Sequence, residues 1–340
     1  MLAGIFISEN SFLQAKESAE AILKLAPDNY QAIKLLGNLY MQENQFDRAK
    51  NYFSTLIELA PQNPDGFFLL GLVNKRQQKY EAAVANFEAA LAKGHSNINV
   101  FVNLVSTLLE NNMIDDAIDR CDENLQKIKN QPYSQAVIYD LKGKLYLAQN
   151  HITLAEKSFK SAIISNPNYL PPYYSLAKIY FSEGREDKAI RQYENAIGSN
   201  AGTRQEMPNM MLGIIFSIKK QWDLAELHYR KALKINPDFV PAANNLAYLL
   251  ADQDKNLDEA LRLAQKAKKI LPDDPRIQDT LGWIYVKLGF YEQAIHAFSD
   301  SIRHLPDNAT LHYHLGMAYY KKGEARQAKA ALEQALKLNN

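Results

Sequence analysis

The sequence has a single cysteine, no long apolar run and almost no net charge, and each absence excludes a class of protein. With Cys121 alone, neither an internal disulfide nor a cysteine metal cluster can form. No stretch approaches the roughly 18 apolar residues of a membrane-spanning helix, so we expect no insertion into a membrane. The 39 basic and 38 acidic residues leave a net charge of +1. That balance argues against a nucleic-acid partner, because proteins that bind nucleic acids usually carry a basic excess.

The N-terminal residues give no targeting signal. The run MLAGIFISENSF has a short apolar stretch, but no basic residue precedes it and no small-residue cleavage site follows, so it is a poor secretory signal. One cysteine is compatible with the cytoplasm and equally with a periplasmic protein that has no disulfides. The compartment therefore stays open: cytoplasmic or, for an exported precursor, periplasmic.

No catalytic or metal-binding motif is present. The sequence has no Walker-type or dinucleotide-binding glycine pattern, no HExxH and no GxSxG. Of the seven histidines only His312 and His314 are close together, and residues two apart on a helix point to different faces. Acidic pairs such as Asp115-Asp116 stand where helices are expected to begin, where they act as caps. We therefore predict no enzyme activity, no cofactor and no metal.

The 13 prolines are the first sign of an internal repeat. Pro27 and Pro61 are 34 residues apart, as are Pro272 and Pro306. None of the prolines lies inside a predicted helix, where each would cost ~3 kcal/mol. The frame predicts a partial repeat followed by nine full ones. Their approximate spans are 1–29 for the partial repeat and then 30–63, 64–97, 98–131, 136–169, 170–203, 206–239, 240–274, 275–308 and 309–340.

The same residue types recur at fixed positions in these repeats. The first helix has a Leu–Gly or Leu–Ala pair three residues before a large apolar residue, as at Leu36-Gly37 and Tyr40. The second helix has a small residue four before an aromatic one, as at Ala49 and Phe53. These spacings place the residues on one helical face, where the small residue lets the partner helix approach. We predict that the recurring aromatic residues form the core.

This pattern resembles the tetratricopeptide repeat (TPR) family over essentially the whole chain. The resemblance implies an all-α solenoid of helix–turn–helix repeats wound into a right-handed superhelix, whose first helices line a concave face that binds a protein or peptide segment. We therefore expect a non-catalytic interaction scaffold. The phrases PDDPRIQDTLGWIYVKLGFYEQAIHAF and NNLAYLLADQDKNLDEAL are also similar to bacterial TPR proteins of exopolysaccharide and PEP-CTERM sorting systems.

The resemblance also implies which side chains face the groove, and their character changes along the chain. In the earlier repeats these positions are polar or basic: Asn38, Lys75, Arg76, Asn103, Lys144 and Lys178. In the later repeats they are apolar or aromatic: Tyr174, Phe181, Met210, Ile214, Tyr248, Trp283, Tyr313, Met317 and Tyr320. Asn244, beside Asn245, matches the asparagines with which some arrays of this family hold a peptide backbone. We expect a partner with apolar anchors in the C-terminal half and acidic groups toward the middle; packing between neighbouring first helices is the alternative for single residues.

Repeat 98–131 departs most from the pattern. Val105 replaces the usual glycine, Cys121 replaces the aromatic residue, and no proline ends the repeat. Extra residues follow it, so we predict a change of superhelical pitch and a boundary between two sub-arrays near 124–135. Repeat 240–274 has one extra residue in its turn, at 252–256. We expect Cys121 to be a buried small hydrophobic residue and not a reactive thiol.

The ends of the array leave other functions open. The first repeat lacks most of its first helix and the last has no polar capping helix, which favours either a piece of a longer protein or pairing with another copy through the ends, as a homo-oligomer. The alternatives to a monomeric interaction module are thus a self-assembling scaffold, or the recognition arm of an enzyme, such as a glycosyltransferase, whose catalytic domain lies outside this stretch.

Overall fold

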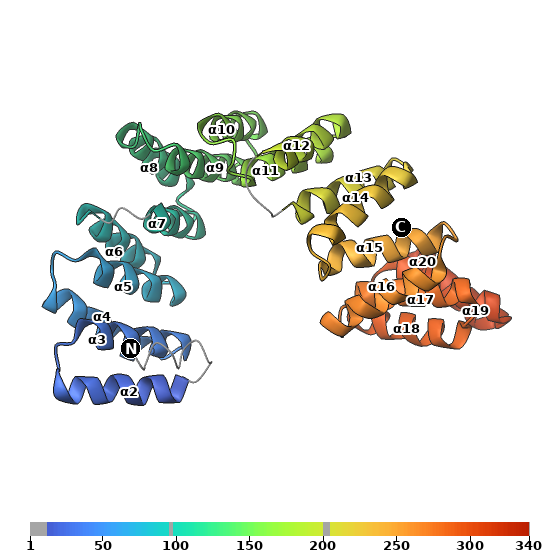
Figure 1. The fold of residues 1–340 in the computed structure, drawn as a ribbon, viewed down its shortest axis with the longest axis horizontal. Helices are drawn as coiled ribbons and strands as arrows, with labels where there is room; N and C mark the ends of the chain where they lie inside the picture. The colour runs from blue at the N-terminus through green and yellow to red at the C-terminus, as the bar shows by residue number, and fades with distance from the viewer. Residues whose placement is uncertain (1–11, 95–97, 200–204, 340) are drawn as a thin grey trace. The chain divides into compact units, whose positions relative to one another are not determined.

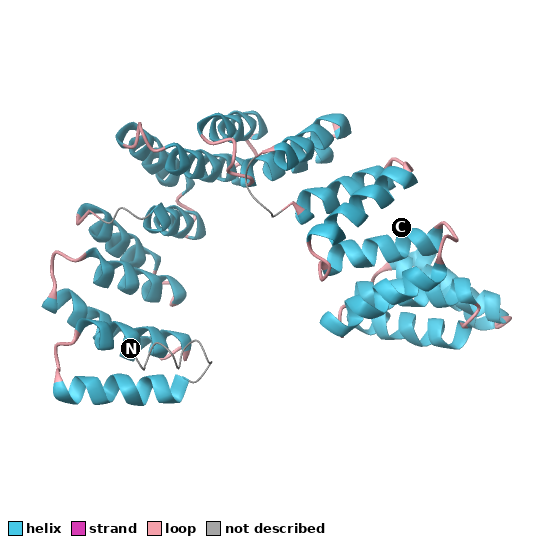
Figure 2. Cartoon of the chain, viewed as in Figure 1, coloured by secondary structure: helices cyan, strands magenta, loops and turns pink. Residues whose placement is uncertain are grey.

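Every regular element in the described part of the chain is an α-helix. The computed structural model describes residues 12–94, 98–199 and 205–339 (Figure 2). Helices in these ranges follow one another as hairpins of two packed helices (Figure 1). The predicted all-α fold of helix–turn–helix repeats is therefore confirmed. None of the described helices is long and apolar enough to cross a membrane.

The helices divide into two compact units between Pro172 and Tyr173. Unit 1 contains α2 (Phe12–Leu25), α3 (Tyr30–Gln42), α4 (Phe46–Leu59), α5 (Pro64–Arg76), α6 (Tyr80–Ala92), α7 (Ile98–Glu110), α8 (Ile114–Lys127), α9 (Pro132–Ala148) and α10 (Ile152–Ser165). Unit 2 contains α11 (Pro171–Ser182), α12 (Glu186–Gly198), α13 (Glu206–Ile218), α14 (Trp222–Ile235), α15 (Val240–Asp252), α16 (Leu257–Ile270), α17 (Pro275–Leu288), α18 (Tyr291–His304), α19 (Ala309–Lys322) and α20 (Ala325–Leu338).

Within each unit the hairpins stack in the same manner. The second helix of one hairpin packs on the first helix of the next, and successive first helices also touch, as α13, α15, α17 and α19 do. The segment 124–135 lies inside unit 1, where α8 and α9 pack on each other. Its role as a boundary between sub-arrays stays a prediction.

A left-handed residue ends the first helix of each hairpin. After α3, Asn44 has a φ of 59° and the N–H of Gln45 donates to the carbonyl of Tyr40 at 2.8 Å. This bond satisfies a carbonyl left free at the helix end, and Gln45 is already the N-cap of α4. The same positive φ recurs at Gln78, Asn112, Asn150, Gly184, Lys220, Asp254, Gly289 and Gly323. Because several residue types adopt this conformation here, no single residue marks the turn in the sequence.

The extra residue predicted at 252–256 is accommodated by a second left-handed residue. Asn256 has a φ of 41°, and its side-chain oxygen accepts a hydrogen bond from the N–H of Glu259 at 3.3 Å. The added residue thus becomes a side-chain N-cap for α16, which satisfies one of the free N–H groups at that helix start.

Most first helices approach their partner at a glycine that faces an aromatic ring. A Cβ on Gly71 would lie 2.6 Å from Cε1 of Phe87, sixteen residues further along the chain. Phe87 is fully buried, so only a glycine permits this approach of the two backbones. The other pairs of this kind are Gly37 with Phe53, Gly143 with Phe159, Gly213 with Tyr229, and Gly282 with Phe298. The predicted core role of these aromatic residues is confirmed.

In the hairpin α7–α8 the larger core residue is on the first helix and the smaller one on the second, the reverse of most other hairpins. Val105 stands where the other first helices have glycine or alanine, and Cys121 stands where most other second helices carry a ring. Both are buried in one hydrophobic cluster, so the larger residue on one helix offsets the smaller one on the other. Burial raises the pKa of the Cys121 thiol to about 12. The predicted burial of Cys121 is confirmed.

Candidate functional site

Two cavities of unit 2 lie along its first helices and adjoin at Ile214. The smaller one, of about 330 Å³, is bounded by α11, α12 and α13. The larger one, of about 570 Å³, is lined mainly by α13, α15 and α17. Because Ile214 of α13 lines both cavities, we treat them as one site and call it the unit 2 groove.

The smaller cavity is apolar apart from one lysine. Its lining residues are Tyr174, Lys178, Phe181, Tyr193, Met207, Met211, Ile214 and Ile215. The rings of Tyr174 and Tyr193 lie 6.1 Å apart and join α11 to α12. Met207 is 42% exposed, and a flexible thioether adapts to whatever side chain it meets. Lys178 is exposed and forms no ion pair with any described residue. The cavity therefore suits an apolar side chain beside a free cation.

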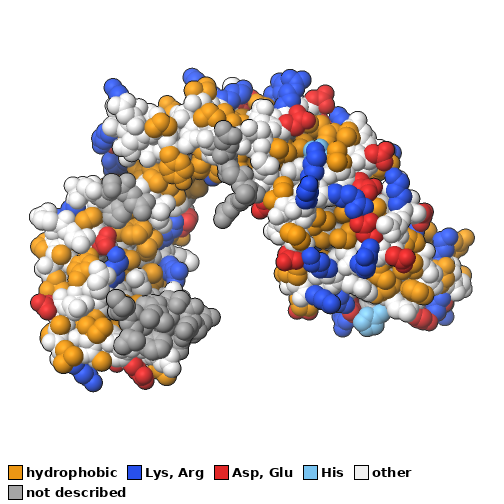
Figure 3. All heavy atoms as spheres, viewed as in Figure 1, with side chains coloured by type: hydrophobic (Ala, Val, Ile, Leu, Met, Phe, Trp, Pro, Cys, Tyr) orange, Lys and Arg blue, Asp and Glu red, His pale blue; other side chains and the backbone are white. Residues whose placement is uncertain are grey.

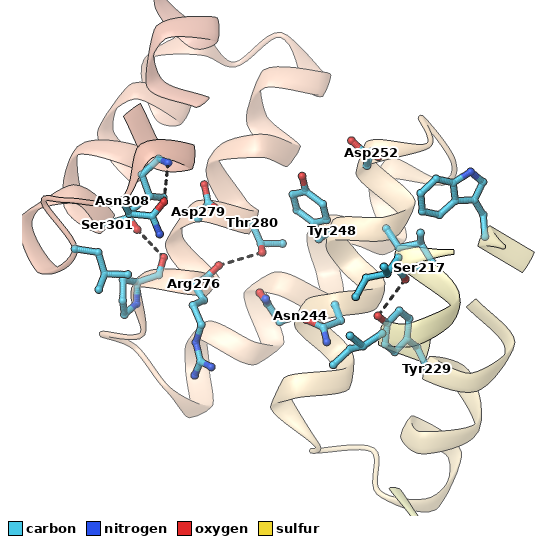
Figure 4. Close-up of a pocket in the computed structure, with 18 residues that line it drawn as sticks. Ser217, Tyr229, Asn244, Tyr248, Asp252, Arg276, Asp279, Thr280, Ser301 and Asn308 are labelled. Carbon is cyan, nitrogen blue, oxygen red and sulfur yellow. Dashed lines mark hydrogen bonds between the residues drawn. The ribbon is translucent and has the colours of Figure 1, made fainter. Parts of the chain in front are cut away.

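The larger cavity is polar and aromatic. Asn244, Tyr248 and Asp252 follow one another by one turn on α15, so they share one face and line the cavity together (Figure 4). Asp279 and Thr280 come from α17. Oδ1 of Asn244 is buried and has no hydrogen-bond partner among the described residues. A buried acceptor without a donor costs roughly 1–3 kcal/mol, which a bound N–H group would relieve.

Tyr248 lies between two carboxylates. Figure 4 shows Asp252 and Asp279 on either side of its hydroxyl group. Burial first, and then the negative charges of Asp252 and Asp279, raise the pKa of Tyr248 to about 12. The hydroxyl group therefore stays protonated at neutral pH and remains a hydrogen-bond donor as well as an acceptor.

The side chain of Arg276 also lines the larger cavity but points away from Tyr248 (Figure 4). Its Nε and Nη2 donate to the two carboxylate oxygens of Asp274, at 3.0 and 2.6 Å. This bidentate pair holds the guanidinium group outside the cluster formed by Tyr248 and its two carboxylates.

His314, which lines neither cavity, joins α19 to α17. His314 is 4% exposed, its Nδ1 lies 2.7 Å from Oδ1 of Asp279, and its ring stacks on Trp283 at 4.8 Å. Nε1 of Trp283 is buried without a partner among the described residues. These contacts fix the position of the Asp279 carboxylate. The described residues contain no group of three His, Cys, Asp or Glu side chains that could hold a metal ion.

Most residues predicted to face the groove in unit 2 do line a cavity. They are Tyr174, Lys178, Phe181, Ile214, Asn244 and Tyr248. Met210 does not, because it is 7% exposed and lies in the core, while its neighbour Met211 lines the smaller cavity. Trp283 and Met317 are half-buried, whereas Tyr313 and Tyr320 are 46% and 64% exposed outside the two cavities. The binding role of all these residues stays a prediction.

The polar positions predicted in unit 1 are largely engaged within the unit. Nζ of Lys75 lies 2.6 Å from Oγ of Ser106 and 3.1 Å from a carboxylate oxygen of Glu110, both on α7. Lys144 pairs with Asp140 of its own helix at 2.7 Å. Of the remaining three, Asn38 is half-buried, Arg76 is exposed near the carbonyl of Met41, and Asn103 donates to the carbonyl of Asn99. Their binding role also stays a prediction.

The sequence prediction misses the carboxylates of the groove. The helical period contains a signal for both, because Asp252 is four residues after Tyr248 and Asp279 is four residues before Trp283, and such residues share a helix face. His314 has no such signal, since its contact with Asp279 joins two different repeats.

Models of one family match most of the chain. The tetratricopeptide repeat matches residues 6–69, 141–202, 218–284 and 309–340, and a TPR repeat model matches residues 282–323.

Curated relatives are similar over about half of the chain. The anaphase-promoting complex subunit CDC16 of Saccharomyces cerevisiae is 26% identical over 200 residues, which cover 57% of this chain and 24% of that protein. The BBSome complex member BBS4 of Bos taurus is 26% identical over 180 residues, covering 52% and 32%. A TPR repeat-containing protein of Pseudomonas aeruginosa is 28% identical over 173 residues, covering 50% and 28%. The chain thus spans about a quarter to a third of the length of these relatives.

Solved structures share the fold at low sequence identity. The crystal structure of the APC/C hetero-tetramer Cut9-Hcn1 has a TM-score of 0.52 and 14% identity, and the match covers 99% of this chain and 92% of that one. The C-terminal part of a TPR repeat-containing protein from Cytophaga hutchinsonii has a TM-score of 0.51 and 17% identity, covering 73% and 99%. These likenesses show the helical-repeat fold alone.

Proposed function

Because the chain belongs to the tetratricopeptide repeat family, we propose that it is a non-catalytic scaffold that binds a segment of a partner protein in the unit 2 groove. This proposal rests on one observation: two cavities that differ in polarity adjoin in the same groove. The smaller is apolar, and the larger presents the unpartnered Oδ1 of Asn244. Together they suit a peptide that inserts apolar side chains and donates a backbone N–H.

Selection of random phage-displayed dodecapeptides on the full chain tests this proposal. Peptides that bind should lose about tenfold or more in affinity when Phe181→Ala and Tyr248→Ala are combined, because each removes an aromatic wall of one cavity. Fluorescence anisotropy measures the affinity, and far-UV circular dichroism checks that helicity is unchanged.

Phe290→Ala is the matched control for these substitutions. Phe290 is 49% exposed and lines neither cavity of the unit 2 groove, so its removal should leave peptide affinity unchanged. Equal binding by wild type and by the Phe181→Ala, Tyr248→Ala variant would show that the groove is not the binding site.

Self-association through the last hairpin is a second candidate function. A cavity of about 430 Å³ between α19 and α20 is lined by apolar residues that include Tyr313 and Leu332, and by Leu336, which is 67% exposed. A second copy of the chain would remove this apolar surface from water. Light scattering over a concentration series measures it, and a constant molecular mass rejects self-association.

We further propose that the scaffold works inside a larger bacterial protein or assembly. The chain spans only about a quarter to a third of the length of its relatives, and two of these relatives are parts of complexes. Both observations support a larger protein or assembly. The similarity to a protein of Pseudomonas aeruginosa supports a bacterial source. An exopolysaccharide or PEP-CTERM system, and an enzyme with its catalytic domain elsewhere, are the finer alternatives. The complete gene and its neighbours distinguish them.

A further inference from the structure

The larger cavity contains two carboxylates that no lysine or arginine of the described chain neutralises. Asp252 on α15 and Asp279 on α17 both line it, and neither forms an ion pair with a lysine or arginine among the described residues. Asp279 has His314 as its partner at 2.7 Å, and within the described ranges Asp252 accepts from the neighbouring Gln253 amide alone, at 3.2 Å. The cavity therefore presents negative charge beside the ring of Tyr248.

Basic side chains on the same helices and turns are held elsewhere. Arg276 is paired with Asp274 and points away from Tyr248 (Figure 4). Lys255 and Lys287 pair with aspartates that do not line the cavity, at 3.3 and 3.0 Å. The face of the molecule shown in Figure 3 has basic and acidic side chains interspersed over unit 2, so the negative charge of the cavity is local.

One repeat in unit 1 has a carboxylate at the same position as Asp279, and there a lysine of the same helix pairs with it. Asp140 of α9 and Asp279 of α17 each stand three residues before the packing glycine of their helix. Four residues after Asp140 is Lys144, which pairs with it at 2.7 Å. Four residues after Asp279 is Trp283, which offers an aromatic surface and no positive charge. The carboxylate in unit 1 thus has a lysine partner on its own helix, although its Oδ1 stays without a hydrogen bond among the described residues. The groove carboxylate Asp279 has no lysine or arginine partner in the described part of the chain and contacts His314 instead.

We infer that the partner segment inserts a lysine or arginine side chain into the larger cavity, with its charged group between Asp252 and Asp279 and against the ring of Tyr248. This inference rests on the proposed function and states the chemistry of the partner. Two carboxylates give charge-assisted hydrogen bonds to a basic group, and an aromatic face adds a cation–π contact. One turn away, Oδ1 of Asn244 accepts from the backbone of the same segment.

The smaller cavity fixes where an apolar anchor stands relative to this basic residue. Successive first helices pack about 10 Å apart, so the apolar cavity between α11 and α13 lies roughly 20 Å from the carboxylates of α15 and α17. An extended chain advances about 3.3 Å per residue. The motif therefore has an apolar residue and a basic residue separated by roughly six positions. Lys178 lines the smaller cavity. An acidic group of the partner segment would pair with it there, which agrees with the acidic groups expected toward the middle of the chain.

The dodecapeptide selection tests the inference through the peptides themselves. Groove-dependent peptides should be enriched in lysine or arginine, and replacing that residue by citrulline in the most frequent peptide should weaken its binding to wild type about tenfold. In a variant that combines Asp252→Asn and Asp279→Asn, the same replacement should change binding by less than about twofold. The asparagine at 279 retains an oxygen for the contact with His314, so the fold is kept, as circular dichroism will verify.

A charge-matched control separates a local effect from the general charge of unit 2. Asp187→Asn and Asp238→Asn also remove two negative charges, from side chains that are 78% and 73% exposed and outside both cavities. In this control the peptide with lysine or arginine should still bind about tenfold more tightly than its citrulline version.

Two failures have different meanings. Selection that yields no groove-dependent peptide overturns the proposed function and this inference with it. Groove-dependent peptides that show no preference for a basic residue, or whose preference survives in the Asp252→Asn, Asp279→Asn variant, overturn this inference alone.

Discussion

Replacing Gly71 by alanine should destabilise the hairpin α5–α6, although the same change in an open helix is stabilising. An alanine in a helix interior normally gains roughly 0.5–1 kcal/mol over glycine. At Gly71 the new Cβ would lie 2.6 and 2.7 Å from Cε1 and Cδ1 of Phe87, and that ring is fully buried. Overpacking of a core costs roughly 1–3 kcal/mol, so the steric effect is the larger one. We expect a net loss of about 1–2 kcal/mol.

Hydrogen exchange of the amides in α5 and α6 measures this loss. A repeat array opens locally, so one unfolding free energy does not describe the whole chain. Gly198→Ala is the matched control, because Gly198 ends α12 and no side chain or backbone of another element lies within 4 Å of its Cβ position. It should leave stability unchanged or raise it.

A second variant, which lacks the ring of Phe87, tests whether that ring causes the loss of stability. With Phe87→Cys, the hairpin carries the small residue that already stands at Cys121 opposite Val105. In that background Gly71→Ala should cost nothing, since the obstacle is gone. An equal loss with and without the ring would refute the steric explanation.

Two further predictions concern titratable side chains. Cys121 should resist thiol-labelling reagents in the native chain and react only on unfolding, because burial hides it and raises its pKa to about 12; rapid native labelling, measured by mass spectrometry, would contradict this. Burial lowers the pKa of His228 to about 4 from its ordinary 6.5. The stability contributed by neutral His228 is thus fully present above about pH 6.5 and is lost as the pH falls toward 4. His228→Gln should therefore flatten the pH dependence of local stability in that window, measured by the hydrogen-exchange protection of the amides in α13 and α14 after correction for the intrinsic exchange rate. An unchanged slope would argue against the assignment.

The fold could be predicted from the sequence because its main contacts are local and repeated. Gly71 meets Phe87 within a single hairpin, and the same spacing recurs along the chain, so each hairpin supports the same interpretation. The turns are less visible. The left-handed position is occupied by residues as different as Asn44 and Lys220, because the helix-end hydrogen bonds and not the side chain fix its conformation.

The groove could be predicted only in part. Phe181 and Tyr248 stand out as large side chains away from the core positions, and both line cavities. Met210 lies in the core and its neighbour Met211 in the cavity, because adjacent helical residues differ by about 100° in direction. The division beside Pro172 has no distinct signal, since the prolines there look like those at other helix starts.

The packing and the recognition in this array depend on different positions of the same helix. In five of the first helices a glycine is constrained by the ring opposite, as Gly282 is by Phe298. The residue three before this glycine, or before the alanine at the same position, varies from repeat to repeat: it is the core residue Met210 in α13, Asp140 in α9, Asn244 in α15 and Asp279 in α17. One backbone position therefore carries an internal ion pair in one repeat, an unpartnered acceptor in another and a groove carboxylate in a third. At Asn244 and Asp279 this position adjoins the unit 2 groove. There the neighbouring helix holds the side chain, as His314 of α19 holds Asp279, and the partner that we propose for the groove would meet it.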